Sequence, residues 1–564
     1  MLKTLAASLR QYKKDSVLTP VFVTFESLLE IVIPTLMAYM IDYGISKGDM
    51  SYVLWMGLAL IAAAMLSLLT GFRAGRCAAV ASSGFARNLR HDMFCNVQRF
   101  SFSNIDKFST ASLITRLTTD VTNVQNAYQM LIRLGVRAPM MMVLALIFCF
   151  RIDAHLSLIF LAAIPVLAVG LGTIMLHVHP IFVRVFKTYD RLNNVVGENL
   201  HGIRVVKSYI REDHEKQKFG DISGSIFQDF SRAEKRLAFN MPLMQFCLNV
   251  CMLLLAWFGA REIIAFNNDP VAGLSTGELA SLITYSLQIL MSLMMLSMIF
   301  VMVIMSRASA ERIVEILTEE SNLKNGENPI HMVKDGSITF ENVTFTYAKG
   351  ADKPVLDEIN LSIASGETVG ILGGTGSSKS SLVQLIPRLY DAVRGKVTVG
   401  GMDVRDYDID SLRDQVAMVL QKNVLFSGTI QENLRWGNEN ATDEEMIRAC
   451  ELAQADGFIR AFPNGYDTYI EQGGTNVSGG QKQRLCIARA LLKKPKILIL
   501  DDSTSAVDTK TDRLIRQAFQ KDIPDTTKII IAQRVSSVQD AGKIIVLNDG
   551  KIYAAGTHDE LIHT

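Results

Sequence analysis

Cysteine is scarce in this sequence, and its spacing is uninformative. The 564 residues include seven cysteines, and no two of them form a C-x-x-C pair. Because seven is odd and the spacings are irregular, no disulfide framework is implied. Cys247 and Cys251 lie one helical turn apart in an apolar run, where packing as small apolar side chains is favoured over metal binding.

An excess of charge of either sign is also missing. The formal net charge is only +1, which gives no indication of a nucleic-acid partner.

The N-terminal region lacks the small-residue cleavage site of a secretory signal, because Lys3, Arg10, Lys13 and Lys14 lead directly into a long apolar stretch.

Long apolar runs are abundant, but only in the first 310 or so residues, and about 240 residues of ordinary soluble composition follow. Six stretches each supply the roughly 20 apolar residues that cross a bilayer. They span residues 17–45, 52–72, 130–150, 156–178, 239–264 and 279–305. The sequence therefore predicts an all-α polytopic membrane domain of six helices.

Basic residues are concentrated in two long connectors, between the second and third and between the fourth and fifth of these stretches. The first connector carries Arg73, Arg76, Arg87, Arg90, Arg99, Lys107 and Arg116, and the second carries Arg184, Lys187, Arg191, Arg204, Lys207 and Arg211. Positive loops stay on the cytoplasmic side of a membrane. We therefore expect a multi-pass protein of the cell (inner or plasma) membrane with its N-terminus, connectors and C-terminal domain in the cytoplasm.

The connectors also contain polar segments, at residues 102–116 and 202–215, that interrupt the long helices. We expect these segments to form short transverse pieces that contact the soluble domain.

Few charges lie inside the predicted spans. Glu26 and Glu30 are spaced i, i+4, and Asp42 lies near the outer end of the first span. A carboxylate inside a membrane is costly unless it faces a cavity or a partner. Two interpretations stay open: Glu26 and Glu30 belong to a functional site that faces a cavity, or they lie close to the interface or pair across helices for packing. Arg133 and Arg137 fall near the end of their span, where we expect them to reach the headgroups.

The C-terminal part contains a glycine-rich turn between an apolar strand, residues 368–372, and the start of a helix. Such a turn presents backbone N–H groups and a helix N-terminus to phosphates, and its lysine and hydroxyl contact phosphate and Mg²⁺. The sequence predicts ATP binding there, with Lys379 on the phosphates and Ser380 on Mg²⁺. The predicted cradle consists of Gly373, Gly374, Thr375, Gly376, Ser377, Ser378, Lys379, Ser380 and Ser381.

One position in this turn departs from the usual pattern, because Ser378 occupies the place of the glycine before the lysine. If the backbone there is left-handed, a serine costs about 1–2 kcal/mol. If it is helical, the change costs almost nothing. We expect ATP binding to survive in either case.

Two further motifs follow the glycine-rich turn. The apolar strand 496–501 ends in Asp501, which would hold Mg²⁺ opposite Ser380. Between them, a polar Gly-Gly turn opens a helix and predicts a second anion-binding N-terminus on a different surface. It consists of Ser478, Gly479, Gly480 and Gln481. Two phosphate-binding sites on different surfaces of one domain suggest a sandwich dimer. Each nucleotide would then be held between the glycine-rich turn of one subunit and the Gly-Gly turn of the other.

These motifs, in this order behind six spans, resemble the ATP-binding cassette (ABC) transporters, specifically a half-transporter of the exporter type, over essentially the whole chain. The resemblance implies an α/β P-loop nucleotide-binding domain and an ATPase coupled to transport. It assigns adenine stacking to Tyr347, and contact with Mg²⁺ and the attacking water to Gln421. Residues 505–508 match a loop that crosses to the partner cassette. The expected domains are 1–320 (membrane), 321–336 (linker) and 337–564 (nucleotide-binding).

Two residues depart from the family pattern at the catalytic position. Asp502 replaces a glutamate that orients water, and Gln533 replaces a switch histidine. Aspartate is one methylene shorter, and a misplacement of about 1 Å can cost on the order of a hundredfold in rate. Glutamine cannot carry histidine's charge or proton. We therefore expect a degenerate site of this chain's own that binds ATP but hydrolyses it slowly.

The Gly-Gly turn matches the signature motif of the family without any change. An intact signature motif in the same chain as a weak catalytic site resembles the degenerate subunit of heterodimeric multidrug exporters. The sequence thus predicts a second, different half-transporter as partner and export of amphipathic, drug-like or lipid-like compounds by alternating access. A homodimeric lipid or peptide exporter, a non-pumping ATP-binding regulator and an exporter-fold importer stay open as alternatives.

Overall fold

The computed structural model describes residues 1–266, 273–347, 353–502 and 507–563. It divides into two compact units. The membrane unit contains Met1–Gln98 and Thr110–Glu319, and the nucleotide unit contains Arg99–Ser109 and Glu320–Thr564. The short segment 99–109 thus belongs with the C-terminal part of the chain, and residues 321–336, predicted as a linker, lie in the nucleotide unit.

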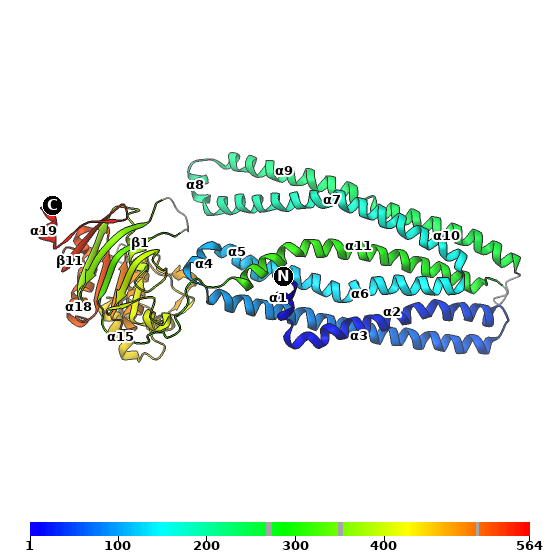
Figure 1. The fold of residues 1–564 in the computed structure, drawn as a ribbon, viewed down its shortest axis with the longest axis horizontal. Coiled ribbons are helices and arrows are strands. Elements are labelled where there is room, and N and C mark those ends of the chain that lie inside the picture. The colour runs from blue at the N-terminus through cyan, green and yellow to red at the C-terminus, as the bar shows by residue number, and fades with distance from the viewer. Residues whose placement is uncertain (267–272, 348–352, 503–506, 564) are drawn as a thin grey trace. The chain divides into compact units, whose positions relative to one another are not determined.

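The membrane unit is built from long apolar helices (Figure 1). After α1 (Leu2–Ala7) and the 3₁₀ turn η1 (Arg10–Tyr12), they are α2 (Lys13–Tyr39), α3 (Met50–Gln98), α6 (Val121–Ile152), α7 (Ala154–His201), α10 (Asn240–Ala265) and α11 (Thr276–Thr318). Six helical stretches of the described residues are long and apolar enough to cross a membrane. The prediction of a six-helix membrane domain is confirmed.

The helices extend well beyond the apolar stretches. α3 has 49 residues, about 74 Å at 1.5 Å per residue. The remaining elements of the membrane unit are the π-helical segments η2 (Met40–Ile45) and η3 (Arg116–Asp120) and the helices α5 (Thr110–Thr115), α8 (Ile203–Ser208) and α9 (Glu212–Leu237). Polar residues break both connectors into short helices, α4 (Phe102–Lys107) in the first and α8 in the second.

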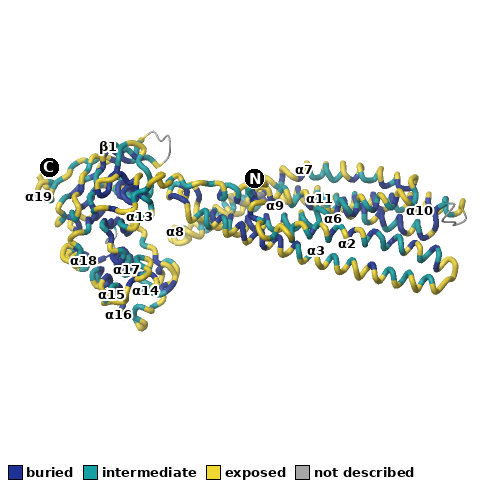
Figure 2. The backbone as a smooth tube through the Cα atoms, turned by 60° about the horizontal axis from the view of Figure 1, so that its bottom comes forward, coloured by how far each residue is buried: buried dark blue, intermediate teal, exposed yellow. Residues whose placement is uncertain are grey.

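Helices α2, α3, α6 and α11 pack together, while α7 packs with α9 and α10. Buried positions recur along the length of this unit (Figure 2). Polar contacts also join the helices: the buried Asp42 accepts a 2.8 Å hydrogen bond from the backbone N–H of Gly277 and another from the Ser275 hydroxyl. Asp42 thereby satisfies donors at the start of α11, where a negative charge is favourable.

The nucleotide unit contains two main sheets. One is antiparallel, in the order β2 (Leu356–Ile363), β1 (Ile338–Phe345), β4 (Arg394–Val399), β5 (Met402–Asp403). The other has the order β12 (Lys551–Gly556), β11 (Lys543–Asn548), β3 (Thr368–Gly373), β10 (Thr527–Ile531), β9 (Ile497–Asp501), β6 (Val416–Val419). All its neighbouring strands are parallel except β12 beside β11. The α/β nucleotide domain is confirmed.

The register of the parallel strands positions the site. Ile531 of β10 pairs with Asp501 of β9 on one side and with Ile371 of β3 on the other. The carboxyl ends of β3, β9, β10 and β6 therefore lie along one edge of the sheet. Ligands of open α/β sheets bind at that edge.

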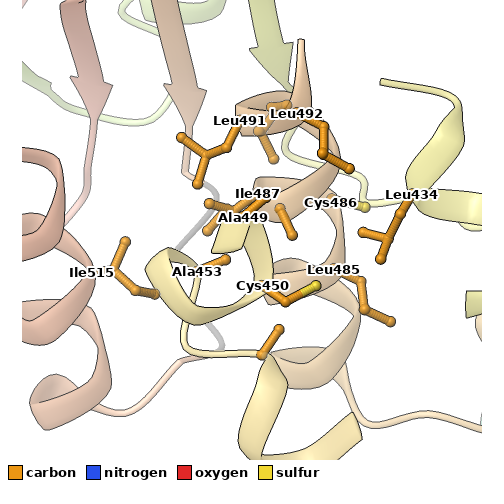
Figure 3. Close-up of a cluster of buried hydrophobic side chains, with 14 of the residues drawn as sticks. Leu434, Ala449, Cys450, Ala453, Leu485, Cys486, Ile487, Leu491, Leu492 and Ile515 are labelled. Atoms are coloured by element: carbon orange, nitrogen blue, oxygen red, sulfur yellow. The ribbon is translucent and has the colours of Figure 1, made fainter. Parts of the chain in front are cut away.

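Helices complete the unit. They are α12 (Lys379–Gln384), α13 (Ile409–Gln415), α14 (Ile430–Arg435), α15 (Asp443–Leu452), α16 (Asp456–Ala461), α17 (Gly479–Leu492), α18 (Thr509–Asp522) and α19 (His558–Ile562). A short hairpin of β7 (Gly428–Thr429) and β8 (Tyr469–Ile470) and the 3₁₀ turns η4 (Gly465–Asp467), η5 (Gln472–Gly474) and η6 (Val535–Ser537) lie between them. Side chains of α14, α15 and α17, among them Leu434, Cys450 and Ile487, share one hydrophobic cluster (Figure 3). This cluster fixes α17, whose N-terminus carries the Gly-Gly turn.

Candidate nucleotide site

The glycine-rich turn lies between β3 and α12 and lines a hollow of about 510 Å³. The ammonium of Lys379 donates hydrogen bonds to the carbonyl oxygens of Gly373 and Gly374, at 2.9 and 2.8 Å. Residues from four strand ends line the same hollow: Gly373, Gly374, Thr375, Gly376, Ser378, Lys379, Ser380, Ser381, Gln421, Asp501, Asp502, Ile531 and Gln533. Of the predicted cradle, only Ser377 does not line it; that residue is buried beneath the turn.

The backbone at Ser378 is left-handed, with φ 70° and ψ 23°. Of the two conformations considered from the sequence, the structure has the costly one. A serine in this conformation is disfavoured by about 1–2 kcal/mol because its Cβ approaches the following carbonyl oxygen. The turn therefore keeps its shape at the expense of local strain.

Asp501 ends β9 and is buried, with an exposed fraction of 4%. Burial raises the pKa of its carboxyl group, and a hydrogen bond with the Ser380 side chain partly opposes that rise. Gln421 lines the same hollow, and the side chains of Asp501, Ser380 and Gln421 all carry the hard oxygen atoms that Mg²⁺ prefers as ligands. The donor set thus fits a magnesium ion carried in with nucleotide phosphates.

Asp502 follows directly and also has a left-handed backbone, with φ 48°. Its Oδ2 atom accepts hydrogen bonds from two side-chain amides, Nε2 of Gln533 at 2.9 Å and Nε2 of Gln421 at 3.4 Å. The three residues predicted to act in hydrolysis therefore lie together. Both amide donors bind the same carboxylate oxygen, Oδ2.

Tyr347 lies near α12, with its hydroxyl 2.9 Å from the Ser381 hydroxyl and 3.2 Å from Oε1 of Gln384. Tyr347 is 48% exposed, and its ring packs edge-on against Phe345 and Tyr390. An exposed aromatic face next to the phosphate turn is a suitable platform for a base.

The Gly-Gly turn is built as a helix cap. Ser478 precedes α17 and forms a reciprocal capping box with Gln481: its hydroxyl accepts from the Gln481 N–H, and its own N–H donates to Oε1 of Gln481. The N–H groups of Gly479 and Gly480 lie in the first turn of this 14-residue helix, where backbone N–H groups have no acceptor within the helix. The turn does not line the hollow at Lys379.

Part of one predicted element lies outside the described residues. Of the loop 505–508, the residues Ser505 and Ala506 are not described. Asp508 caps α18 by accepting a 3.0 Å hydrogen bond from the N–H of Thr511.

The structure adds Tyr390 to the predicted site residues. Its hydroxyl donates a 2.6 Å hydrogen bond to Asp106 of α4, and its ring contacts Phe102 of α4 and Tyr347. Tyr390 thus connects the aromatic platform with α4. The sequence predicts α4 as a contact element, but nothing in a single chain marks a tyrosine 284 positions away as its partner.

Together, the fold and the site define a multi-pass membrane protein with a P-loop nucleotide-binding domain. Residues 17–311 match the ABC transporter transmembrane region family, and residues 356–505 match the ABC transporter family of nucleotide-binding domains. The chain therefore belongs to the ABC transporters, as a half-transporter with one membrane and one ATP-binding domain, and is an ATPase coupled to transport.

Individual relatives match along nearly the whole chain. The ABC transporter ATP-binding protein YfiB of Bacillus subtilis (strain 168) is 36% identical over 537 residues, which are 95% of this chain and 92% of YfiB. The ATP-dependent lipid A-core flippase of Desulfotalea psychrophila is 33% identical over 478 residues, 84% of this chain and 82% of the flippase.

A solved structure, a bacterial Atm1-family ABC exporter with ATP bound, matches with a TM-score of 0.83 over 99% of this chain and 96% of that one, at 24% identity. That likeness supports the exporter fold.

Proposed function

We propose that this chain is the degenerate-site subunit of a heterodimeric ATP-driven exporter. The observation that carries the proposal is the environment of Asp502, whose Oδ2 atom is bound by the amides of Gln533 and Gln421. A general base must reach the water that it activates, and here the aspartate side chain is one methylene shorter than the family's glutamate and is held back by hydrogen bonds from two amides. The site at Lys379 holds ATP and Mg²⁺ but turns over slowly.

The same chain carries an intact signature at the start of α17. Its capping box and glycine pair form an anion-binding helix N-terminus. Because this turn does not line the hollow at Lys379, it serves the nucleotide of the partner subunit. The partner therefore supplies the fast site and has its own glutamate and histidine.

The proposed orientation places the N-terminus and the nucleotide unit in the cytoplasm, in accordance with the basic connectors. ATP closes the two nucleotide domains, α4 and α8 pass the movement to the spans, and hydrolysis at the partner's site resets the cycle. The proposed substrates are amphipathic compounds that enter from the cytoplasmic side or leaflet.

A lipid is a second candidate substrate, favoured by the similarity to a lipid A-core flippase. Fluorescent lipid and cationic dye, offered separately to vesicles that contain the chain and its partner, distinguish the two by which one moves when ATP is added.

A pair of substitutions in the co-purified complex tests the proposed asymmetry. Asp502→Ala should leave most of the ATPase activity, because the slow site contributes little. Gly479→Asp should abolish most of it, because a carboxylate then faces the phosphates of the fast site. Equal losses in both variants would contradict the proposal, and so would a larger loss in Asp502→Ala.

A further inference from the structure

An ion-paired group of three side chains lies inside the membrane unit. Nη1 of Arg137 on α6 donates to Oε1 of Glu26 on α2 at 2.7 Å, and Nη2 of the same arginine donates to both oxygens of Glu30 at 2.7 and 2.8 Å. The pairing across helices that the sequence left open for Glu26 and Glu30 is therefore present, with Arg137 as the partner. Two carboxylates share one guanidinium, so the three groups together carry one excess negative charge when both carboxylates are ionised.

One oxygen of this group has no donor. The Oε2 atom of Glu26 is buried and accepts no hydrogen bond from any described residue, and the Glu26 side chain is only 9% exposed. A buried acceptor on a charged group is costly when it has no partner. The arrangement therefore favours a ligand that brings both a positive charge and a hydrogen-bond donor.

The neighbouring helix α3 is shaped to admit these charges. A Cβ at Gly71 would lie 2.8 Å from Oε1 of Glu26, so a larger residue there would displace the carboxylate from its present position. One turn along, Gly75 faces the guanidinium of Arg133, with 3.8 Å between that group and the position of a Cβ. Arg133 forms no ion pair within the described part of the chain.

Helix α11 brings a further acceptor to the same level. The Ser281 hydroxyl donates to the carbonyl of Pro34, and the Tyr285 hydroxyl to that of Ile31. From Ser281 to Tyr285 the sequence of α11 advances by four residues, while the contacted carbonyl on α2 moves back from Pro34 to Ile31. The next turn of α11 therefore lies at the level of Glu26 and Glu30. That turn carries Gln288, whose Oε1 atom is also buried without a described donor.

We propose that Glu26, Glu30 and Gln288 form a recognition site for a protonated amine on the transported compound, with Arg137 holding the two carboxylates in place. This inference rests on the proposed function, because it names the class of substrate: amphiphiles that carry a primary or secondary ammonium group. The ammonium supplies the missing positive charge and up to three N–H donors. Glu30 and Arg137, whose side chains are 26% and 23% exposed, are the accessible side of the group.

The test measures binding to the full chain in lipid nanodiscs, without ATP. The probe is dansylcadaverine, which has a primary ammonium, and its neutral N-acetyl derivative is the matched ligand. Empty nanodiscs correct for partition into lipid. Wild type should bind the amine at least about tenfold more tightly than the acetylated form, the selectivity expected when a charged hydrogen-bond partner is removed.

Variants separate recognition from packing. Glu26→Gln and Glu30→Gln should each weaken amine binding by about tenfold and leave the acetylated probe unaffected. Glu311→Gln, which removes the same charge from an exposed pair on α11, should change neither. Arg137→Gln should weaken amine binding, because the two carboxylates lose the guanidinium that holds them in place, and should leave the acetylated probe unaffected, whereas a purely structural clamp predicts weaker binding of both probes. Equal affinity for the two probes in wild type would overturn the inference, and so would unchanged amine binding in both glutamate variants.

The readout is independent of hydrolysis. If the amine binds as expected but Asp502→Ala destroys the ATPase activity of the complex, the proposed subunit role fails and the recognition site stands. If the ATPase asymmetry is found without amine selectivity, the recognition site fails alone.

Discussion

Replacing Ser378 by glycine should stabilise the nucleotide unit, because the change removes strain at one known backbone position. The serine has φ 70°, which costs a residue with a Cβ about 1–2 kcal/mol relative to glycine. Glycine in turn gives the unfolded chain more freedom, which costs about 0.4–1 kcal/mol. The difference is a net stabilisation of roughly 0.8 kcal/mol from these two ranges.

The expected signal is a rise in the unfolding midpoint of the nucleotide unit. For a domain of 150–250 residues, 1 kcal/mol corresponds to about 2–4 °C, so Ser378→Gly should raise the midpoint by about 2–3 °C. Thermal denaturation of the full chain in detergent, followed at a fixed protein concentration, measures this shift.

Thr375→Gly is the matched control within the same turn. Thr375 is exposed and does not have a positive φ, so glycine there relieves no strain and only frees the unfolded chain. Its midpoint should fall. If Ser378→Gly lowers the midpoint as much as Thr375→Gly does, the left-handed strain is absent and the reasoning is refuted.

Three other changes give separate tests. Tyr390→Phe removes the hydrogen bond to Asp106 and keeps the ring. It should therefore lower substrate-stimulated ATPase activity severalfold without changing the affinity for ATP. An equal loss of ATP affinity would show that Tyr390 acts in nucleotide binding instead. Gly277→Ala puts a Cβ 2.4 Å from the carbonyl oxygen of Ala38 and should destabilise the membrane unit by about 1–3 kcal/mol, seen as a lower unfolding midpoint; an unchanged midpoint would contradict this packing. Burial raises the pKa of Asp501, so the folded chain holds this proton to a higher pH than the unfolded chain does, and this group's contribution to stability falls as pH rises through the folded pKa. Asp501→Asn should therefore raise the midpoint at pH 7 while abolishing Mg²⁺-dependent ATP binding, and a lower midpoint would show that the carboxylate is well compensated.

Much of the fold follows from local sequence properties. Six apolar stretches of sufficient length predict six spans, because length and hydropathy alone decide whether a helix can cross a bilayer. The residues of the glycine-rich turn, Asp501, Asp502 and Gln533 could be predicted to meet because each follows a strand of apolar residues, and parallel strands end at one edge.

What the sequence does not predict depends on contacts between distant residues. The conformation of Ser378 stayed open because serine is compatible with both a helical and a left-handed backbone. The pairing of Arg137 with Glu26 and Glu30 depends on how α2 and α6 face each other, and the contact of Tyr390 with Asp106 depends on tertiary packing. Neither leaves a periodic signal in a single sequence.

The most direct test of the slow site restores the glutamate and the histidine that the family has at positions 502 and 533. The full chain, purified without a partner and reconstituted in lipid, is compared with the double variant Asp502→Glu, Gln533→His under saturating MgATP. The account predicts slow hydrolysis by the wild type and a rate on the order of a hundredfold higher for the double variant, which regains a carboxylate of full reach and a histidine beside the nucleotide. A wild type that already hydrolyses ATP as fast as the double variant would contradict it.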